Sequence, residues 1–266
     1  ALSASFDRSL RLWDLDSGEL LHSFEGHQGL VLGVALVPPD YRRVLSASND
    51  RSVRVWDLET GAALYVLEGH SGSVSAVVAL PDGRRAISAS ADGTLRLWDL
   101  DSGTALRVLR GHQGPVNGVT ALPDGRRVIS ASEDGTLRLW DVRSADEPIP
   151  PVRERGWSIR SLTLLPGGEQ ALSASFDGTL QLWDLVAGQG RRLTPGRTEP
   201  ILKLAALPDG RHVLSSLSDG ALRLWNLESG ETIRILHGHS SGVLGLAALP
   251  DGRSRCGPRA SRAAGA

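Results

Sequence analysis

Short segments of alternating apolar and polar residues, separated by turn residues, recur along the whole chain. One of them runs from Ala86 to Asp99 as Ala-Ile-Ser-Ala-Ser-Ala-Asp-Gly-Thr-Leu-Arg-Leu-Trp-Asp. A run of small and β-branched residues, an Asp-Gly pair and a Leu-x-Leu-Trp alternation indicate two strands joined by a tight hairpin turn. No segment keeps a helical period, so the sequence predicts an all-β protein.

Six tryptophans mark the period of this pattern. They are 42 or 43 residues apart, and every one except the last is followed by Asp: Trp13, Trp56, Trp98, Trp140, Trp183 and Trp225. Two further turns recur between them, one of which reads Pro-Asp-Gly at 81–83, 123–125, 208–210 and 250–252. Three turns in each unit predict four short strands.

These units resemble the repeats of the WD-repeat β-propeller family, with Gly-His before the first strand and Trp-Asp closing the third. The resemblance covers residues 1–252 and implies a ring of six four-stranded antiparallel blades. Because the chain begins in the second strand of a unit, segment 243–248 is expected to complete a blade shared by the two ends. The alternatives are an open ring or part of a seven-bladed propeller.

Two compositional features and the similarity of the repeats bear on the origin of the chain. It contains no Met, and Lys203 is the only lysine among 29 basic residues. The near-identical repeats are similar to those appended to bacterial multidomain regulators, so we expect a propeller that is one part of a larger bacterial signalling protein. Residues 253–266 leave the repeat pattern and predict a flexible basic tail.

Charge and cysteine content exclude several classes. The net charge of −1 provides no positive field for a nucleic acid. No apolar run is long enough to span a membrane, and the single Cys256 cannot form an internal disulfide. We therefore expect a monomeric, cytoplasmic protein without a cofactor.

His, Ser, Asp and Trp recur together at constant spacing. The sets are His27, Ser46, Asp50 and Trp56; His70, Ser88, Asp92 and Trp98; His112, Ser130, Asp134 and Trp140; and, from the two chain ends, His239, Ser3, Asp7 and Trp13. Ser, His and Asp together are typical of a hydrolase triad, but one catalytic site needs one triad and here the set is repeated. The resemblance implies a buried hydrogen-bonded network in each blade, and we predict a structural role without enzymatic activity.

Two units lack the His, and a function is expected where the units differ. Arg197 takes its place in the sixth unit, and Arg155 or Trp157 lies near it in the fifth. These residues either substitute for the His or reflect drift of a weak repeat. The proline-rich segment 144–151 is expected to replace the outermost strand of the fourth blade.

In the family that the chain resembles, partners usually bind the narrow end of the ring. The contacting positions are the start of the first strand and the residue before the turn Asp. An apolar arc occupies these positions on consecutive blades: Phe6, Leu30, Leu32, Phe176, Leu202 and Leu244. A second candidate patch contains Trp157 and Arg160, because Trp and Arg are common anchors of interfaces.

The sequence therefore predicts a non-enzymatic scaffold or sensor that binds a protein or peptide on its narrow face. The alternative for the two Phe side chains is that they cap the core. The alternative function is a small-ligand-binding or catalytic propeller with a site in the central channel.

Overall fold

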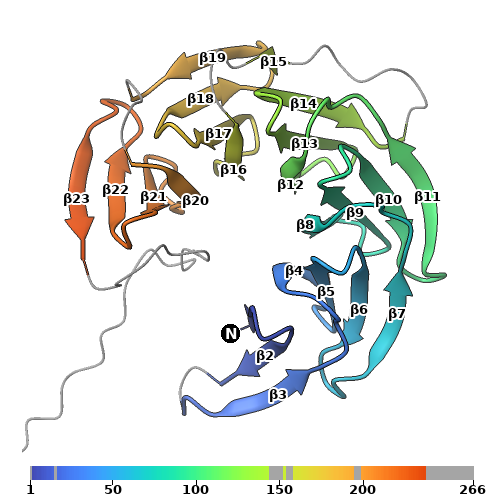
Figure 1. The fold of residues 1–266 in the computed structure, drawn as a ribbon. Helices are drawn as coiled ribbons and strands as arrows, with labels where there is room; N and C mark the ends of the chain where they lie inside the picture. Colours follow the sequence, from blue (N-terminus) through green and yellow to red (C-terminus); the bar gives the residue numbers. More distant parts are fainter. Residues whose placement is uncertain (1, 15–16, 144–151, 154–157, 195–198, 238–266) are drawn as a thin grey trace, which may run out of the picture.

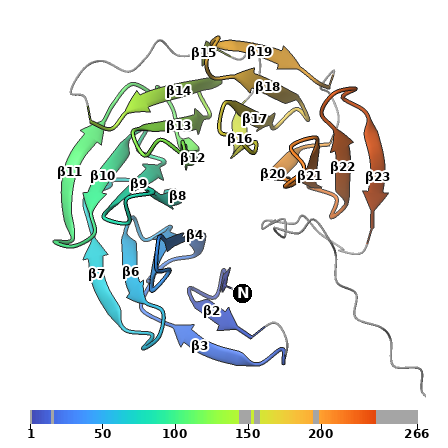
Figure 2. The ribbon, with the colours of Figure 1, turned by 180° about the vertical axis from the view of Figure 1, so that it is seen from behind.

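The computed structural model describes residues 2–14, 17–143, 152–153, 158–194 and 199–237. Within these ranges the chain forms strands β1 to β23 and no helix. The strands form six antiparallel sheets that follow one another around a central axis (Figures 1 and 2). Each sheet consists of consecutive strands of the chain, which is the arrangement that the repeat pattern predicts.

The first three sheets contain the N-terminal half of the chain. The first sheet has three strands: β1 (Leu2–Ala4), β2 (Leu10–Trp13) and β3 (Leu20–Phe24). The second contains β4 (Val31–Val37), β5 (Arg43–Ser48), β6 (Val53–Asp57) and β7 (Ala63–Leu67). The third contains β8 (Val74–Ala79), β9 (Arg85–Ser90), β10 (Leu95–Asp99) and β11 (Thr104–Leu109).

The remaining three sheets each have four strands. The fourth contains β12 (Val116–Ala121), β13 (Arg127–Ser132), β14 (Thr136–Asp141) and β15 (Val152–Arg153). The fifth contains β16 (Ile159–Leu164), β17 (Gln170–Ser175), β18 (Leu180–Asp184) and β19 (Gln189–Arg192). The sixth contains β20 (Ile201–Ala206), β21 (His212–Leu217), β22 (Leu222–Asn226) and β23 (Thr232–Leu236).

The hydrophobic core lies between neighbouring sheets rather than inside any one of them. Trp98 of the third sheet, for example, packs in one buried cluster with Val55 and Leu67 of the second. Toward the axis, small residues allow the innermost strands to approach. A Cβ built on Gly33 of β4 would lie 3.4 Å from the Cα of Ala76 on β8. The lack of a side chain at Gly33 therefore lets β4 and β8 pack closely.

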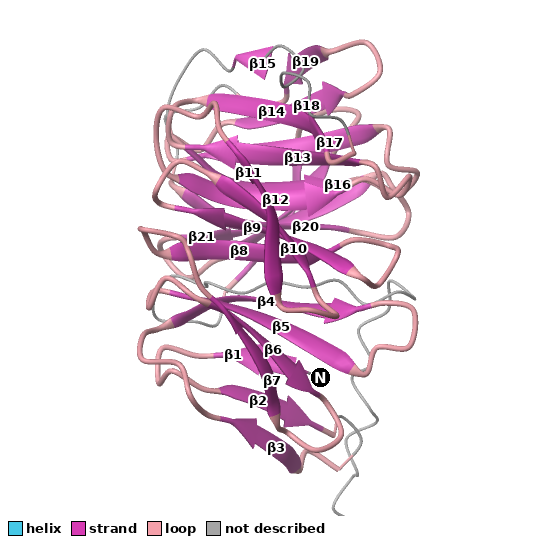
Figure 3. Ribbon diagram, turned by 90° about the vertical axis from the view of Figure 1, so that its right-hand side faces the viewer, coloured by secondary structure: helices cyan, strands magenta, loops and turns pink. Residues whose placement is uncertain are grey.

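The strands run between two faces of the ring, as the side view shows (Figure 3). Innermost strands begin at the face that also carries the turns after the second strands, because Val31 pairs with Ser48 at the end of β5. We call this the narrow face. Its six turns are residues 5–9, 48–52, 90–94, 132–136, 175–179 and 217–221.

The all-β class and the six-sheet propeller architecture are confirmed. Segment 243–248 and the tail 253–266 lie outside the described residues, so closure of the ring and the domain boundary stay predictions. The outermost strand described in the fourth sheet follows the proline-rich segment. It is β15, whose Arg153 pairs with Thr136. The proline-rich segment itself lies outside the described residues.

Candidate functional site

A continuous chain of hydrogen bonds joins His, Ser, Asp and Trp in the second, third and fourth sheets. In the third sheet, Nδ1–H of His70 donates to Oδ2 of Asp92 at 2.8 Å. The Ser88 hydroxyl lies 2.8 Å from Nε2 of His70 and accepts the indole N–H of Trp98 at 2.8 Å. The same bonds, at 2.7–2.9 Å, join the corresponding residues His27, Asp50, Ser46 and Trp56, and His112, Asp134, Ser130 and Trp140.

Each network includes a hydroxyl that the sequence analysis missed. It belongs to the residue two positions after the Asp. Thr94 donates to Oδ1 of Asp92 at 2.7 Å, and Ser52, Thr136 and Ser9 donate to their Asp at 2.6 Å. The pattern Asp-x-Ser/Thr, visible in these units, was the signal for it. The second carboxylate oxygen therefore has a partner as well, as buried acceptors require.

Burial and hydrogen bonding keep these carboxylates charged and these imidazoles neutral. Burial by itself raises the pKa of Asp92, but donation from the Thr94 hydroxyl and from His70 lowers this pKa to about 2. Burial lowers the pKa of His70 below its ordinary value of 6.5 and outweighs the effect of the carboxylate. The pKa shifts have the same directions at the equivalent positions: Asp50, Asp134, His27 and His112.

The environment of the serines argues against a catalytic role for these sets. Ser46, Ser88 and Ser130 are all 0% exposed. A nucleophile must reach its substrate, and each of these hydroxyls is instead held between an imidazole and an indole. The arrangement can satisfy buried polar groups and fix the packing of each sheet.

The first sheet contains part of the fourth predicted set. Trp13 donates to Ser3 at 2.9 Å. Asp7 accepts from Ser9 and from the Arg11 guanidinium, the latter at 3.1 Å. His239 lies outside the described residues, so its place in this set stays a prediction.

The fifth and sixth sheets keep the Trp–Ser bond and lack the His. Trp183 donates to Ser173 at 2.9 Å, and Trp225 donates to Ser215 at 2.8 Å. Arg155, Trp157 and Arg197, the residues predicted near the vacant positions, lie outside the described residues.

An arginine that the sequence analysis missed lies beside the Asp of the fifth sheet. Arg192 on the outermost strand β19 approaches Oδ2 of Asp177 to 4.0 Å and donates to the Thr179 hydroxyl at 2.9 Å. No repeat signal identifies it, because outermost strands vary from unit to unit. In the fifth sheet the carboxylate of Asp177 thus has a guanidinium nearby. The equivalent carboxylate of the third sheet, Asp92, is bonded to His70 instead.

Arginines recur on the third strands, and two of them are half-buried against the tryptophan of their own sheet. The guanidinium groups of Arg54 and Arg96 lie over the rings of Trp56 and Trp98, at 5.7 and 6.0 Å from the ring centroids. A Cβ on Gly69 would lie only 2.5 Å from Nη1 of Arg96. The glycine of the Gly-His pair therefore leaves room for the arginine on the indole.

The narrow face exposes two phenylalanines strongly and its leucines less. Phe6 is 56% exposed and Phe176 is 45% exposed, whereas Leu30, Leu32 and Leu202 are half-buried. Leu244 and Trp157 lie outside the described residues.

Backbone hydrogen bonds join Phe6 and Leu30 into one neighbourhood. The Ser5 carbonyl, next to Phe6, accepts the N–H of Val31 at 3.2 Å. Val31 follows Leu30 and begins the innermost strand of the second sheet. The first turn of the narrow face therefore lies against the start of β4.

Arg160 orients Phe176 on the fifth sheet. Its guanidinium lies over the phenyl ring, 5.4 Å from the centroid, and Nη1 is 3.3 Å from the Glu133 carboxylate on the neighbouring sheet. Asn117 also reaches across this boundary and donates to the Ile159 carbonyl at 2.9 Å. Phe176 thus lies at the border between the apolar arc and the polar residues of the fourth sheet.

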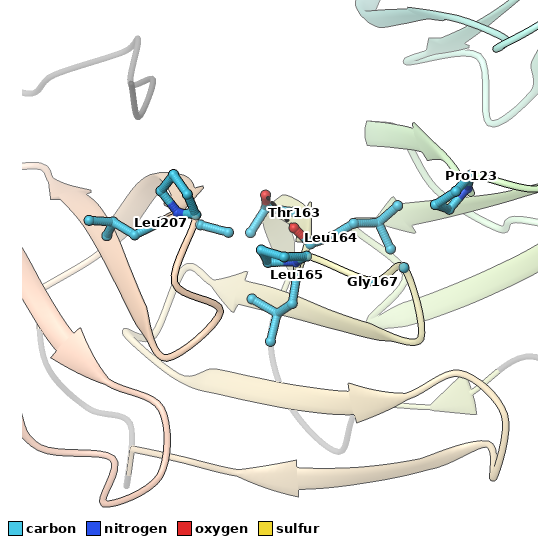
Figure 4. Close-up of a pocket in the computed structure, with 10 residues that line it drawn as sticks. Pro123, Thr163, Leu164, Leu165, Gly167 and Leu207 are labelled. Atoms are coloured by element: carbon cyan, nitrogen blue, oxygen red, sulfur yellow. Dashed lines mark hydrogen bonds between the residues drawn. The ribbon is translucent and has the colours of Figure 1, made fainter. Parts of the chain in front are cut away.

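A cavity of about 370 Å³ lies on the opposite face, near the ends of β16 and β20 (Figure 4). Turn prolines and leucines form most of its wall: Pro123, Pro166, Pro208, Leu164, Leu165 and Leu207. Its lining contains no acidic or basic side chain. This composition is unlike that of a catalytic site, which needs positioned acids, bases or nucleophiles.

The described residues show neither a metal-ligand cluster nor a membrane-spanning helix. No three His, Cys, Asp or Glu side chains in these ranges are grouped as metal ligands would be. None of the described segments forms a helix that is long and apolar enough to cross a membrane.

Comparison with known proteins agrees with the repeat and the fold. The model of the family described as the IFT122 first beta-propeller matches residues 1–256. The probable E3 ubiquitin ligase complex SCF subunit scon-2 of Neurospora crassa is 46% identical over 39 residues, which are 15% of this chain and 6% of that protein. The six antiparallel sheets and the match over most of the chain lead to one conclusion: the chain belongs to the IFT122 first beta-propeller family and is a WD-repeat β-propeller.

Proposed function

We propose that the chain is a non-enzymatic interaction module, a scaffold or sensor that binds a protein or peptide on its narrow face. The difference in exposure among its three phenylalanines is the observation that supports this proposal. Phe24 is fully buried, whereas Phe6 and Phe176 are 56% and 45% exposed. Both exposed rings stand at the residue before the turn Asp. Aromatic side chains gathered on one face are the usual anchors of a protein interface.

The surroundings of the two rings support this role. The carbonyl of Ser5, next to Phe6, is bonded to the N–H of Val31, next to the half-buried Leu30, so the two apolar residues lie in the same part of the narrow face. Arg160 holds the face of Phe176 and is itself paired with Glu133. A ring that is oriented before binding loses less freedom when a partner packs against it.

The proposal extends to the whole ring. In this proposal, segment 243–248 supplies the fourth strand of the first sheet and thereby closes a ring of six blades. The ring acts as a monomer in the cytoplasm. The near-zero net charge supports protein rather than nucleic-acid partners. The alternative of a small-ligand or catalytic site at the channel draws no support from the cavity of the opposite face, whose lining is mainly apolar.

The double variant Phe6→Ser/Phe176→Ser tests the binding face. Peptides selected from a randomised display library on the wild-type chain should bind this variant at least tenfold more weakly, because both anchors are lost. The matched control is Leu106→Ser/Val186→Ser, which removes two exposed apolar residues from an outermost strand and from the opposite face.

A thermal melt separates binding from packing. If the Phe side chains only cap the core, the double variant melts at a lower temperature and retains the affinity of the wild type. Undiminished peptide capture by the folded double variant would reject the proposed site.

A further inference from the structure

Two of the six narrow-face turns carry arginine where the other four carry glycine. In every turn the N–H of this residue donates to the carbonyl three positions earlier, as Arg8 does to Ser5 at 3.3 Å and Arg51 does to Ser48 at 3.2 Å. All six residues have a left-handed backbone. Their φ angles are 75° at Arg8, 72° at Arg51, 79° at Gly93, 74° at Gly135, 80° at Gly178 and 87° at Gly220.

The turn itself does not need an arginine. A residue with a Cβ is strained in the left-handed region, whereas glycine adopts it without a steric penalty. The four glycine turns make the same backbone bond at 3.1–3.3 Å. Residues with a strained backbone cluster at functional sites, where the surrounding structure holds them in place.

Both arginines lie beside the apolar part of the narrow face. The carbonyl of Ser5 accepts from Val31, and the carbonyl of Leu30 accepts the N–H of Asn49 at 2.9 Å. The segment Leu30–Val31 is thereby bonded to the turn of Arg8 on one side and to the turn of Arg51 on the other. Exposed Phe6 belongs to the first of these turns.

The acidic groups of these turns are already engaged elsewhere. Asp7 accepts from Ser9 and Arg11, and Asp50 accepts from His27 and Ser52. The side chains of Arg8 and Arg51 are exposed, and neither is paired with an acid among the residues that the structure describes. Two guanidinium groups on adjacent blades are therefore available to an anionic partner.

We propose that Arg8 and Arg51 make this part of the narrow face a site for an acidic peptide segment. Asp or Glu carboxylates of the peptide pair with the two guanidinium groups, and a neighbouring apolar side chain packs on Phe6 and Leu30. Guanidinium groups hold carboxylates through charge-assisted hydrogen bonds, and charge complementarity sets which partner binds. This inference rests on the proposed function, whose binding face it shares.

A randomised peptide library displayed on phage, selected separately on two full-length chains, tests the inference. The chains are the wild type and Arg8→Gly/Arg51→Gly. Peptides recovered on the wild type should carry Asp or Glu close to Leu, Ile or Phe, and the variant should lose this acidic preference. For one recovered peptide, fluorescence anisotropy should show about tenfold weaker binding to the variant. Its affinity for the wild type should also fall when NaCl is raised from about 0.05 to 0.5 M.

Two further variants control for folding and for total charge. Glycine is the residue that the other four turns carry, so the variant keeps the turn. Arg8→Lys/Arg51→Lys keeps both charges and should bind within about threefold of the wild type. Arg42→Ala/Arg211→Ala removes two exposed arginines from the opposite face and should leave affinity unchanged.

The outcomes separate this inference from the function on which it rests. Peptides without acidic residues that bind Arg8→Gly/Arg51→Gly as tightly as the wild type, yet need Phe6 or Phe176, overturn the inference and leave the binding face intact. Peptides that need neither ring overturn the proposed function. Recovery of no peptide overturns both.

Discussion

The second, third and fourth sheets differ from the fifth and sixth in how their polar groups are satisfied. In the former, the Asp of each narrow-face turn binds a buried neutral imidazole, as Asp92 binds His70 at 2.8 Å. In the latter the His is absent. Asp177 has Arg192 at 4.0 Å, and Asp219 accepts the backbone N–H of Ala221. Both groups nevertheless form four-stranded sheets with the same register.

This difference shows which interactions build a blade and which add to its stability. The bond from a Trp to a Ser is present in all six sheets, and the Trp is buried in every sheet except the first, where Trp13 is half-buried. They accompany the apolar alternation that lets sheets pack on one another. The His–Asp contact occurs in only half of the sheets as described. It is therefore not needed for the fold of a blade, and we predict that it contributes to stability instead.

Replacing the Asp should have the largest effect, and only in a sheet that has the network. Asp92→Ala leaves His70, Thr94 and the backbone N–H of Ser71 without their acceptor. Since buried donors without partners are costly, the free energy of unfolding should fall by about 3 kcal/mol. Urea denaturation followed by tryptophan fluorescence measures the change.

The matched control is the same substitution in the sixth sheet. Asp219 is exposed and accepts from a backbone N–H, so Asp219→Ala should lower the free energy of unfolding by less than about 1 kcal/mol. Equal effects of the two substitutions would show that the network adds no stability.

The substitution His239→Ala tests whether the first sheet has a His–Asp network, like the second to fourth sheets, or lacks one, like the fifth and sixth. If segment 243–248 closes the ring, His239 completes the set of Ser3, Asp7 and Trp13, and its removal should lower the free energy of unfolding by about 2 kcal/mol. His237→Ala, two residues away, should change it by less than about 0.5 kcal/mol, because His237 is exposed. A negligible effect of His239→Ala favours an open ring.

The fold and the networks were predictable because both depend on local register. Trp98 and Ser88 are ten positions apart in one hairpin, so the spacing that repeats in every unit also brings their side chains together. The hydroxyl of Thr94 follows Asp92 by two positions in the same turn. Its bond to Asp92 was therefore predictable from the same constant spacing.

Contacts that depend on how side chains pack in three dimensions, rather than on a constant spacing in the sequence, were not predictable. Arg192 reaches the fifth-sheet turn from an outermost strand whose pairing shows no repeated residue. The placement of Arg96 over an indole depends on the space that Gly69 leaves. Arg51 was partly predictable. The sequence shows that Asp-Arg replaces Asp-Gly at this turn, but it does not show that the arginine has a left-handed backbone.

The network sheets should also be the ones that acid destabilises. Burial lowers the pKa of His27, His70 and His112 in the folded chain, whereas in the unfolded chain they titrate near 6.5. Below that pH the unfolded state binds more protons, so the free energy of unfolding falls as pH falls. Between pH 7.5 and 6.0 three such residues account for at most about 2 kcal/mol.

Hydrogen exchange at the two pH values locates this loss. After correction for the intrinsic pH dependence of exchange, strands β4 to β14 should lose more protection at pH 6.0 than β16 to β23. The lowered pKa values of the Asp residues act below their ordinary 3.8 and do not contribute in this range. An equal loss in both regions would contradict the assignment of acid sensitivity to the imidazoles.

The smallest effect is expected at the turn of the second sheet, which combines a complete network with a strained residue. Arg51→Gly removes a left-handed side chain at φ 72°. Relief of this strain is partly offset by the greater freedom of glycine in the unfolded chain, so the free energy of unfolding should rise by about 0.5 to 1 kcal/mol. Chemical denaturation of the single variant measures it.

The sign of this change distinguishes strain from an ordinary surface substitution. Arg42 is exposed and does not have a left-handed backbone, so Arg42→Gly should lower the free energy of unfolding by about 0.5 to 1 kcal/mol. If Arg51→Gly also lowers it, the arginine stabilises the turn and needs no other reason to be there. If it raises stability and weakens acidic-peptide binding together, Arg51 serves binding rather than folding. The second sheet then contains two kinds of residue side by side: a hydrogen-bonded network that stabilises the fold, and an arginine that is kept for binding a partner.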